Sequence, residues 1–213
     1  ESGIDFILPC VALLTNGSVL VAFRKQSANS IYYKICNYTK NSLEVGSLYT
    51  IATQTLTNNT VFDIQQFDSE SVIICWDDYN QRAHHFHCHC GRNGCHTCTQ
   101  WWYDYDAEYV IIDKNGANKK QVVLYENNST GNDFHRVCNV QVCVGESNFC
   151  IVWQTTAEIY FEIINKATHT TVVNNLDINT TSLLNWTVNN PLPVSIESIT
   201  KNNFIIVWYD NTY

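Results

Sequence analysis

The sequence predicts an all-β protein built from repeated antiparallel meanders, and three observations lead to this prediction. Short apolar runs rich in β-branched and aromatic residues alternate with polar turns along the chain. No stretch shows the 3.6-residue period of an amphipathic helix. Four ten-residue windows align without gaps, so one structural unit recurs along the chain.

Each window contains an apolar residue, four turn-forming residues and an apolar run that ends in an aromatic residue. The windows read LTNGSVLVAF, FDSESVIICW, VGESNFCIVW and ITKNNFIIVW, and they span residues 14–23, 67–76, 144–153 and 199–208. Their aromatic ends are spaced by 53, 77 and 55 residues, so the middle interval indicates an insertion of about 24 residues (77 minus 53).

A second element follows the first and third windows, as IYYKICN (31–37) and IYFEIIN (159–165). Each repeat is therefore predicted to be a four-stranded meander: an approach strand, the apolar strand, the I-Y-x-x-I strand and a more polar outer strand. The apolar strand is apolar on both faces and needs cover on both, which favours propeller-like blades or, alternatively, a stacked β-sandwich. We expect a single domain over 1–213, with repeats at about 5–56, 57–130, 134–190 and 191–213.

This pattern resembles extracellular repeats of about fifty residues in which an F-V-V-x-W strand precedes I-Y-x-x-I-x-N. Such repeats occur in large surface proteins of bacteria and protists. The resemblance covers nearly the whole chain and implies propeller-like blades in a surface or fibre protein, but it implies no activity. The chain departs from the pattern because the turns of its second and fourth windows lack the usual glycine and because it carries a cysteine-rich insertion at about 84–105.

Composition favours a globular protein and argues against nucleic acid and membranes as partners. Hydrophobic residues make up 45% of the chain and charged residues 15%, so the chain can bury a core. The net charge is −8 and the 12 basic residues are dispersed, so we expect neither nucleic acid nor an anionic membrane surface as a partner. The apolar runs are too short to be inserted across a membrane.

Ten cysteines, an even number, suit an oxidising compartment, and N-glycosylation sequons point the same way. We therefore expect an extracellular or cell-surface location. The sequons at which we expect N-linked glycans are Asn16, Asn37, Asn58, Asn127, Asn128, Asn179 and Asn185.

The fourth repeat contains only its first two strands, which leaves the edge of an apolar strand without a partner. Three arrangements would satisfy that edge: a longer array of which this chain is a part, closure by the N-terminal segment, or a strand from a neighbouring copy. We expect the third, with residues 1–8 required, and it would produce a filament of identical copies. The residues expected at this assembly edge are Ile4, Phe6, Phe204, Ile206, Trp208, Tyr209 and Tyr213.

The stretch HHFHCHCGRNGCHTC (84–98) is the one place where the sequence suggests metal or redox chemistry. Cys95 and Cys98 have zinc-ligand spacing and, with His87, are weak metal candidates. We instead expect Cys88, Cys90, Cys95 and Cys98 to form two disulfides that staple a loop, and we expect no cofactor.

Two further disulfides are expected elsewhere in the chain. Cys143 and Cys150 should lie opposite each other across a turn, and Cys10 could tie the first strand of repeat one to Cys36 in its third strand. Cys75 and Cys138 remain without a firm assignment.

No catalytic motif is present, so we do not expect an enzyme. Asp104, Asp106 and Glu108 alternate along a predicted strand and could bind calcium, but we expect a solvated acidic face. Two functions are thus predicted. The first is a secreted, N-glycosylated structural subunit of a filament or surface coat. The alternative is a carbohydrate-binding adhesin in which Trp101 and Trp102 stack on sugars.

Overall fold

The structure, a computed structural model, is all-β in the part of the chain that it describes, which confirms the predicted fold class. It describes residues 6–25, 30–39, 42–51, 61–91, 94–127, 137–155, 158–178 and 194–208, with backbone alone at 79–105 and at a few strand ends.

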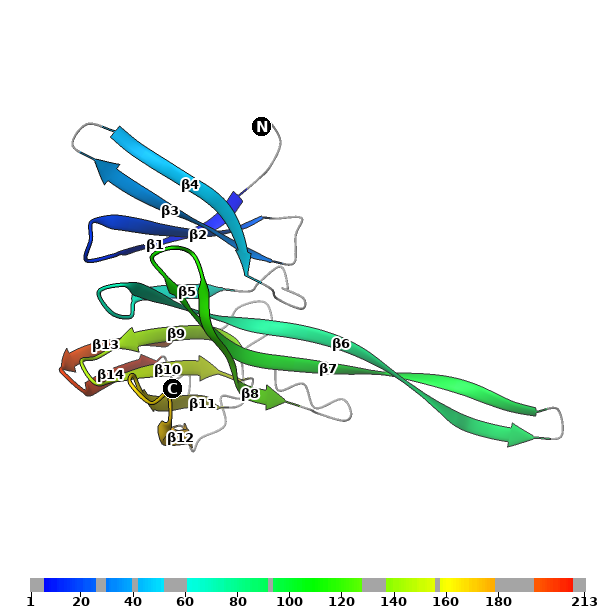
Figure 1. The fold of residues 1–213 in the computed structure, drawn as a ribbon. Helices are drawn as coiled ribbons and strands as arrows, with labels where there is room; N and C mark the ends of the chain where they lie inside the picture. The colour runs from blue at the N-terminus through cyan, green and yellow to red at the C-terminus, as the bar shows by residue number, and fades with distance from the viewer. Residues whose placement is uncertain are drawn as a thin grey trace.

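Within these ranges, fourteen strands form three four-stranded antiparallel sheets and one two-stranded sheet (Figure 1). Sheet A contains β1 (Phe6–Leu13), β2 (Ser18–Lys25), β3 (Ile31–Thr39) and β4 (Ser42–Ile51). Sheet B contains β5 (Phe62–Gln66), β6 (Ser71–Gly91), β7 (Gly94–Asp113) and β8 (Asn118–Asn127). Sheet C contains β9 (Cys138–Val144), β10 (Asn148–Gln154), β11 (Ile159–Asn165) and β12 (Thr171–Asp177). Sheet D contains β13 (Val194–Thr200) and β14 (Asn203–Trp208).

The sheets stack in chain order, with an apolar core between each pair of neighbours. Leu20 of sheet A and Trp76 of sheet B belong to the first core, and Tyr109 of sheet B and Trp153 of sheet C to the second. Ile196 of sheet D packs in the third core, against sheet C. The described sheets form an open stack and do not close into a ring, so propeller closure stays a prediction.

The second strand of the two middle sheets is buried on both faces, as the sequence predicted. All residues from Val72 to Trp76 in β6 and from Phe149 to Trp153 in β10 are fully buried. The equivalent strands at the ends of the stack are just as apolar but are covered on one face, because sheets A and D each have one neighbour. As a result β2 alternates between buried and half-buried positions, and β14 alternates between exposed and half-buried positions from Asn203 to Val207.

The first strands of successive sheets, β1, β5, β9 and β13, lie next to one another. Each sheet presents side chains of its first strand to the backbone edge of the next first strand. Asp63 of β5 accepts a hydrogen bond from the Val142 N–H of β9 at 3.1 Å, and Gln65 accepts one from Val144 N–H at 3.2 Å. These contacts satisfy backbone groups that would otherwise be an unpaired sheet edge.

The insertion is a two-stranded ribbon, and the predicted loop was wrong. β6 and β7 pair from Ser71 opposite Asp113 to Gly91 opposite Gly94, and their outer part extends far from the stacked sheets (Figure 1). The third strand of sheet B is the inner end of β7, at Ala107–Asp113, which follows the insertion. The ribbon continues the hairpin between the second and third strands, so the meander resumes after it.

Neither of the two further disulfides is formed. Cys10, Cys36, Cys75, Cys143 and Cys150 are free thiols. Cys10 pairs with Ala22 and Cys36 with Val19, so β2 separates them by two strand spacings of about 4.8 Å and three residues along the strand. That separation exceeds the Cα distance that a disulfide can span. The side chains of the other five cysteines lie outside the described residues.

In the ranges described above, no helix is long and apolar enough to cross a membrane.

Candidate functional site

The open edge of sheet D is the candidate functional site. Of the strands that the structure describes, β14 pairs with β13 alone. The Ser198 N–H of β13 points away from β14, toward the sulfur of Cys143, so Ser198 and Phe204 form a non-hydrogen-bonded pair. By the alternation of an antiparallel ladder, the N–H and C=O groups of Phe204, Ile206 and Trp208 point outward, away from β13.

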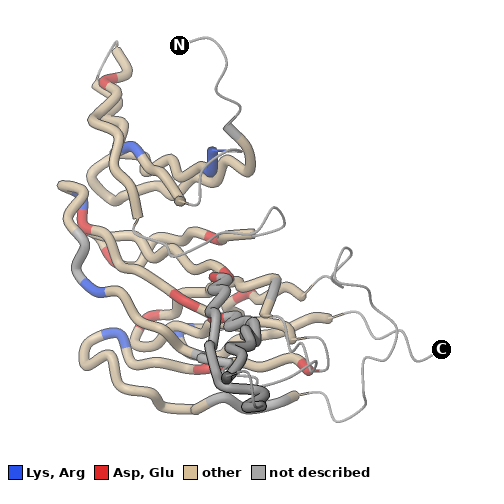
Figure 2. The backbone as a smooth tube through the Cα atoms, turned by 90° about the vertical axis from the view of Figure 1, so that its right-hand side faces the viewer, with Lys and Arg blue, Asp and Glu red and all other residues tan. Residues whose placement is uncertain are grey.

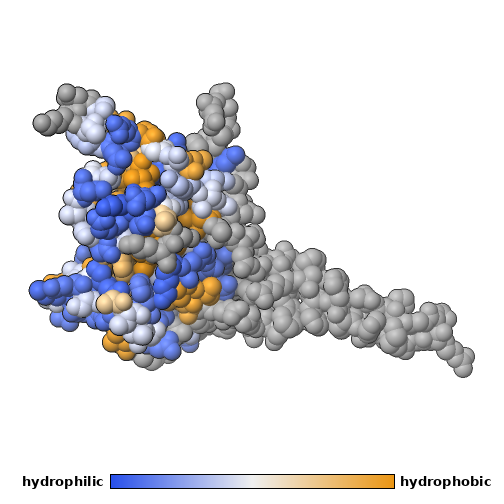
Figure 3. Space-filling view, in the orientation of Figure 1, coloured by the Kyte–Doolittle hydropathy of each residue, from blue (hydrophilic) through white to orange (hydrophobic). Residues whose placement is uncertain are grey.

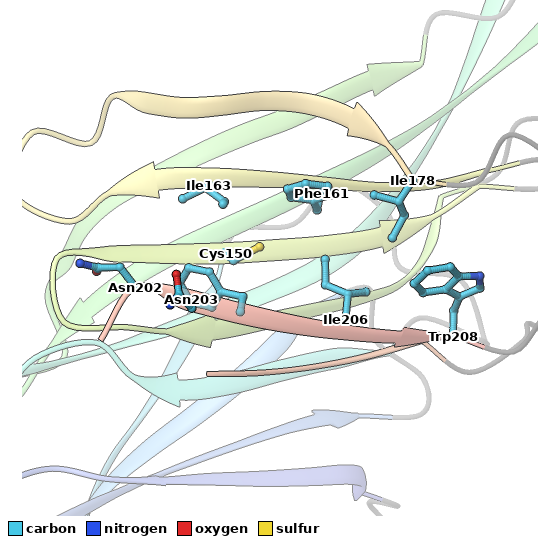
Figure 4. Close-up of a pocket in the computed structure, with 9 residues that line it drawn as sticks. Cys150, Phe161, Ile163, Ile178, Asn202, Asn203, Ile206 and Trp208 are labelled. Carbon is cyan, nitrogen blue, oxygen red and sulfur yellow. The ribbon is translucent and has the colours of Figure 1, made fainter. Parts of the chain in front are cut away.

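An apolar pocket of about 570 Å³ lies beside this edge, between sheets D and C (Figure 4). Phe204, Ile206 and Trp208 line it from β14, and Phe161 and Ile163 line it from β11. In sheet B the corresponding position beside the second strand is filled by β7. The pocket therefore lies where a third strand of sheet D would pack.

The turn before β14 fixes sheet D against sheet C. Asn202 uses its Oδ1 atom to accept hydrogen bonds from the N–H groups of Ser147 at 3.0 Å and Asn148 at 3.2 Å. The backbone C=O of Lys201 accepts one from the Glu146 N–H. These bonds fix the start of β14 beside the turn between β9 and β10. The outward edge of β14 therefore runs along the pocket.

Cys150 lines the same pocket and lies directly opposite Cys143, as the sequence predicted. Burial raises the pKa of Cys150 to about 12, with a smaller contribution from Cys143. Burial also raises the pKa of Cys143 to about 11, with a smaller contribution from Glu197. Both groups therefore stay as thiols near neutral pH, the form that reacts slowly with disulfides and oxidants.

The remaining predicted edge residues are distributed as follows. Phe6 belongs to β1, where it pairs with Lys25, and its side chain is not described. Ile4, Tyr209 and Tyr213 lie outside the described residues. Of residues 1–8, residues 6–8 belong to β1 of sheet A and residues 1–5 lie outside the described residues.

The backbone of the cysteine and histidine cluster forms the far end of the ribbon. Cys90 pairs with Cys95 and His89 with His96, and a register shift lies between His87 and His89. The side chains there, including that of Cys98, are outside the described residues, as are those of Trp101 and Trp102. In the described ranges, no group of three or more potential ligand residues is placed to hold a metal ion.

The acidic face predicted at residues 104–108 is not solvated where its side chains are described. Asp106 is 7% exposed and Glu108 is 4% exposed, because sheet A covers this face of sheet B. Burial raises the pKa of Glu108 to about 7, and neighbouring Asp78 and Asp106 add to the effect. A hydrogen bond of 3.1 Å from Gln121 Nε2 opposes it. Glu108 is therefore protonated in part at neutral pH.

Of the sequon residues, Asn16 and Asn37 have described side chains, and both are exposed. Gly17, with φ of 84°, forms the turn that presents Asn16. Asn58, Asn128, Asn179 and Asn185 lie outside the described residues, as does the side chain of Asn127. Lys and Arg are dispersed over the described chain, without a basic stripe (Figure 2).

Neither a family model nor a curated protein matches the chain. The resemblance to repeats of surface and fibre proteins accordingly stays a prediction from the sequence.

Proposed function

We propose that this chain is a secreted, N-glycosylated structural subunit that assembles with identical copies into an extracellular filament or surface coat. The open edge of β14 beside an apolar pocket is the observation that carries the proposal. A strand from a neighbouring copy would pair with the outward N–H and C=O groups of β14 and place alternate side chains in the pocket.

The chemistry of the site supports strand addition over capture of a polar small molecule. Ile205, Val207 and Trp208 are 46%, 58% and 38% exposed. Among the described strands β14 pairs with β13 alone, so this edge combines an open backbone ladder with apolar side chains. Such an edge favours pairing with another strand because pairing removes both from water. The exposed sequon residues Asn16 and Asn37 support the extracellular part of the proposal.

A proline substitution tests the strand-addition step. Ile206→Pro removes one outward N–H without removing a hydrogen bond to β13, and Ile206→Ala is the matched control that keeps the N–H. We expect the wild type and the alanine variant to form polymers in electron micrographs and sedimentation, and the proline variant to remain a folded monomer. Polymers of the proline variant, or a wild type that stays monomeric, would contradict the proposal.

A further inference from the structure

At each end of the sheet stack, one face of the last sheet has no other described sheet against it. Each sheet has a preceding face, toward the sheet before it in the chain, and a following face, toward the sheet after it. In sheets B and C both faces are covered. No described sheet covers the preceding face of sheet A or the following face of sheet D.

The preceding face of sheet A carries apolar side chains at positions that are buried in the middle sheets. Phe23 aligns with Trp76 and Trp153, which are fully buried against the preceding sheet, but Phe23 is only half-buried. Val11 is 64% exposed, although its equivalent in sheet C, Val142, is fully buried. Figure 3 shows apolar side chains at the surface in the upper part of the molecule, where sheet A lies.

The following face of sheet D shows the same contrast. Ile205 is 46% exposed and Val207 is 58% exposed. Their equivalents in sheet C, Cys150 and Val152, are fully buried by sheet D itself. Each end of the stack therefore leaves apolar side chains in water at positions that the middle sheets bury.

In sheet B, two side chains of the first strand accept backbone hydrogen bonds from sheet C. The first strand of sheet D has side-chain acceptors at the two equivalent positions. Asp63 and Gln65 pair with Cys75 and Ile73 in the same register in which Ser195 and Glu197 pair with Val207 and Ile205. Ser195 and Glu197 thus occupy the positions from which Asp63 and Gln65 accept backbone hydrogen bonds of the next first strand.

The matching donors lie on β1. Leu14 N–H bonds to Ser18 C=O, so Leu13 and Val11 fall on non-hydrogen-bonded positions of the β1–β2 ladder and their N–H groups point outward. These are the equivalents of the Val144 and Val142 N–H groups that Gln65 and Asp63 hold in the B–C interface.

We propose that the following face of sheet D binds the preceding face of sheet A of a second copy of this chain. Glu197 and Ser195 accept the outward N–H groups of β1, and Val207 and Ile205 cover Val11. The charges are complementary, because the preceding face of sheet A carries Lys25 and Lys34 and the following face of sheet D carries Glu197. The interface joins two different surfaces, so it repeats head to tail and yields an open filament or a closed ring.

This inference rests on the proposed self-assembly and adds the surface of the partner copy that takes part. Two aspartate variants each disable one end: Val11→Asp on sheet A and Val207→Asp on sheet D. Both sites are exposed in the monomer, so each variant is expected to fold, which urea denaturation would check. Val172→Asp on β12 is the matched control, because Val172 and Val207 are both 58% exposed.

We expect either end variant alone to raise the concentration needed for polymerisation on the order of 100-fold, because assembly buries an unpaired carboxylate. The control variant should polymerise like the wild type. A mixture of the two end variants retains one intact interface per pair and should form dimers that do not grow, as seen by sedimentation velocity. Dimers of either end variant alone would contradict head-to-tail contact.

The outcomes separate this inference from the proposal on which it rests. If Ile206→Pro prevents polymers but Val11→Asp and Val207→Asp polymerise normally, strand addition stands and the stacking inference is wrong. If both end variants block growth and their mixture gives dimers, the stacking inference is supported even if Ile206→Pro still polymerises. A wild type that stays monomeric overturns both.

Discussion

Replacement of Glu108 by glutamine should remove a pH-dependent loss of stability. Burial between sheets A and B raises the Glu108 pKa from its ordinary value of 4.5 to about 7, and Asp78 and Asp106 contribute further. A carboxyl group with a raised pKa in the folded state stabilises the fold while it is protonated. That contribution is full below pH 4.5 and is lost as the pH rises through about 7.

The expected magnitude follows from the same two values. Each pH unit between them corresponds to about 1.36 kcal/mol, so the free energy of unfolding should fall by at most about 3 kcal/mol between pH 4.5 and pH 8. Glutamine has the shape of the protonated acid and cannot ionise. It should therefore leave stability at pH 4.5 nearly unchanged and raise it at pH 8.

Urea denaturation of both proteins at half-unit intervals from pH 4.5 to pH 8 measures this difference. The two curves of unfolding free energy should diverge as the pH rises, with Glu108→Gln the more stable protein at pH 8. Parallel curves, or a wild type that gains stability relative to the variant at high pH, would refute the burial argument for this carboxylate.

Three further predictions concern packing, thiols and glycans. Trp153→Ala should lower the unfolding free energy by about 3–5 kcal/mol, and Trp208→Ala by less than half as much, because Trp208 is 38% exposed; urea denaturation compares them. Cys143 and Cys150 should resist iodoacetamide at pH 8 in the native protein and react after urea unfolding, and a linked peptide in mass spectrometry would contradict free thiols. Asn16→Gln should remove one N-glycan from the secreted protein, and an unchanged intact mass would show that this sequon is unused.

The strands of sheets A, C and D were predictable because each repeat combines a polar turn with an apolar run. The sequence also indicated two-sided burial, since runs such as Val72–Trp76 have no polar face. The third strand of sheet B was missed because the ribbon separates it from its hairpin partner. The signal was present, since YVIID at 109–113 matches YKICN at 33–37 in pattern.

The acidic residues were misjudged for a related reason. Alternation of Asp106 and Glu108 with Ala107 and Tyr109 normally indicates one solvated face. In a middle sheet of a stack both faces are covered. Alternating polar and apolar residues in such a strand therefore place the polar side chains on one buried face and the apolar side chains on the other. Ser195 and Glu197 could not be singled out from sequence at all, because their importance depends on the register between neighbouring sheets.

The three apolar cores between neighbouring sheets differ in size, and this difference predicts the order in which the sheets separate under tension. In the described residues, fifteen buried apolar side chains form the A–B core and thirteen the B–C core, but six form the C–D core. Under tension along the stack, sheet D should detach first and leave the larger cores intact. In a fibre of such units, stretching would first break the contacts between sheets C and D of each subunit. These contacts would form again when the tension is released, and the other sheets would stay packed.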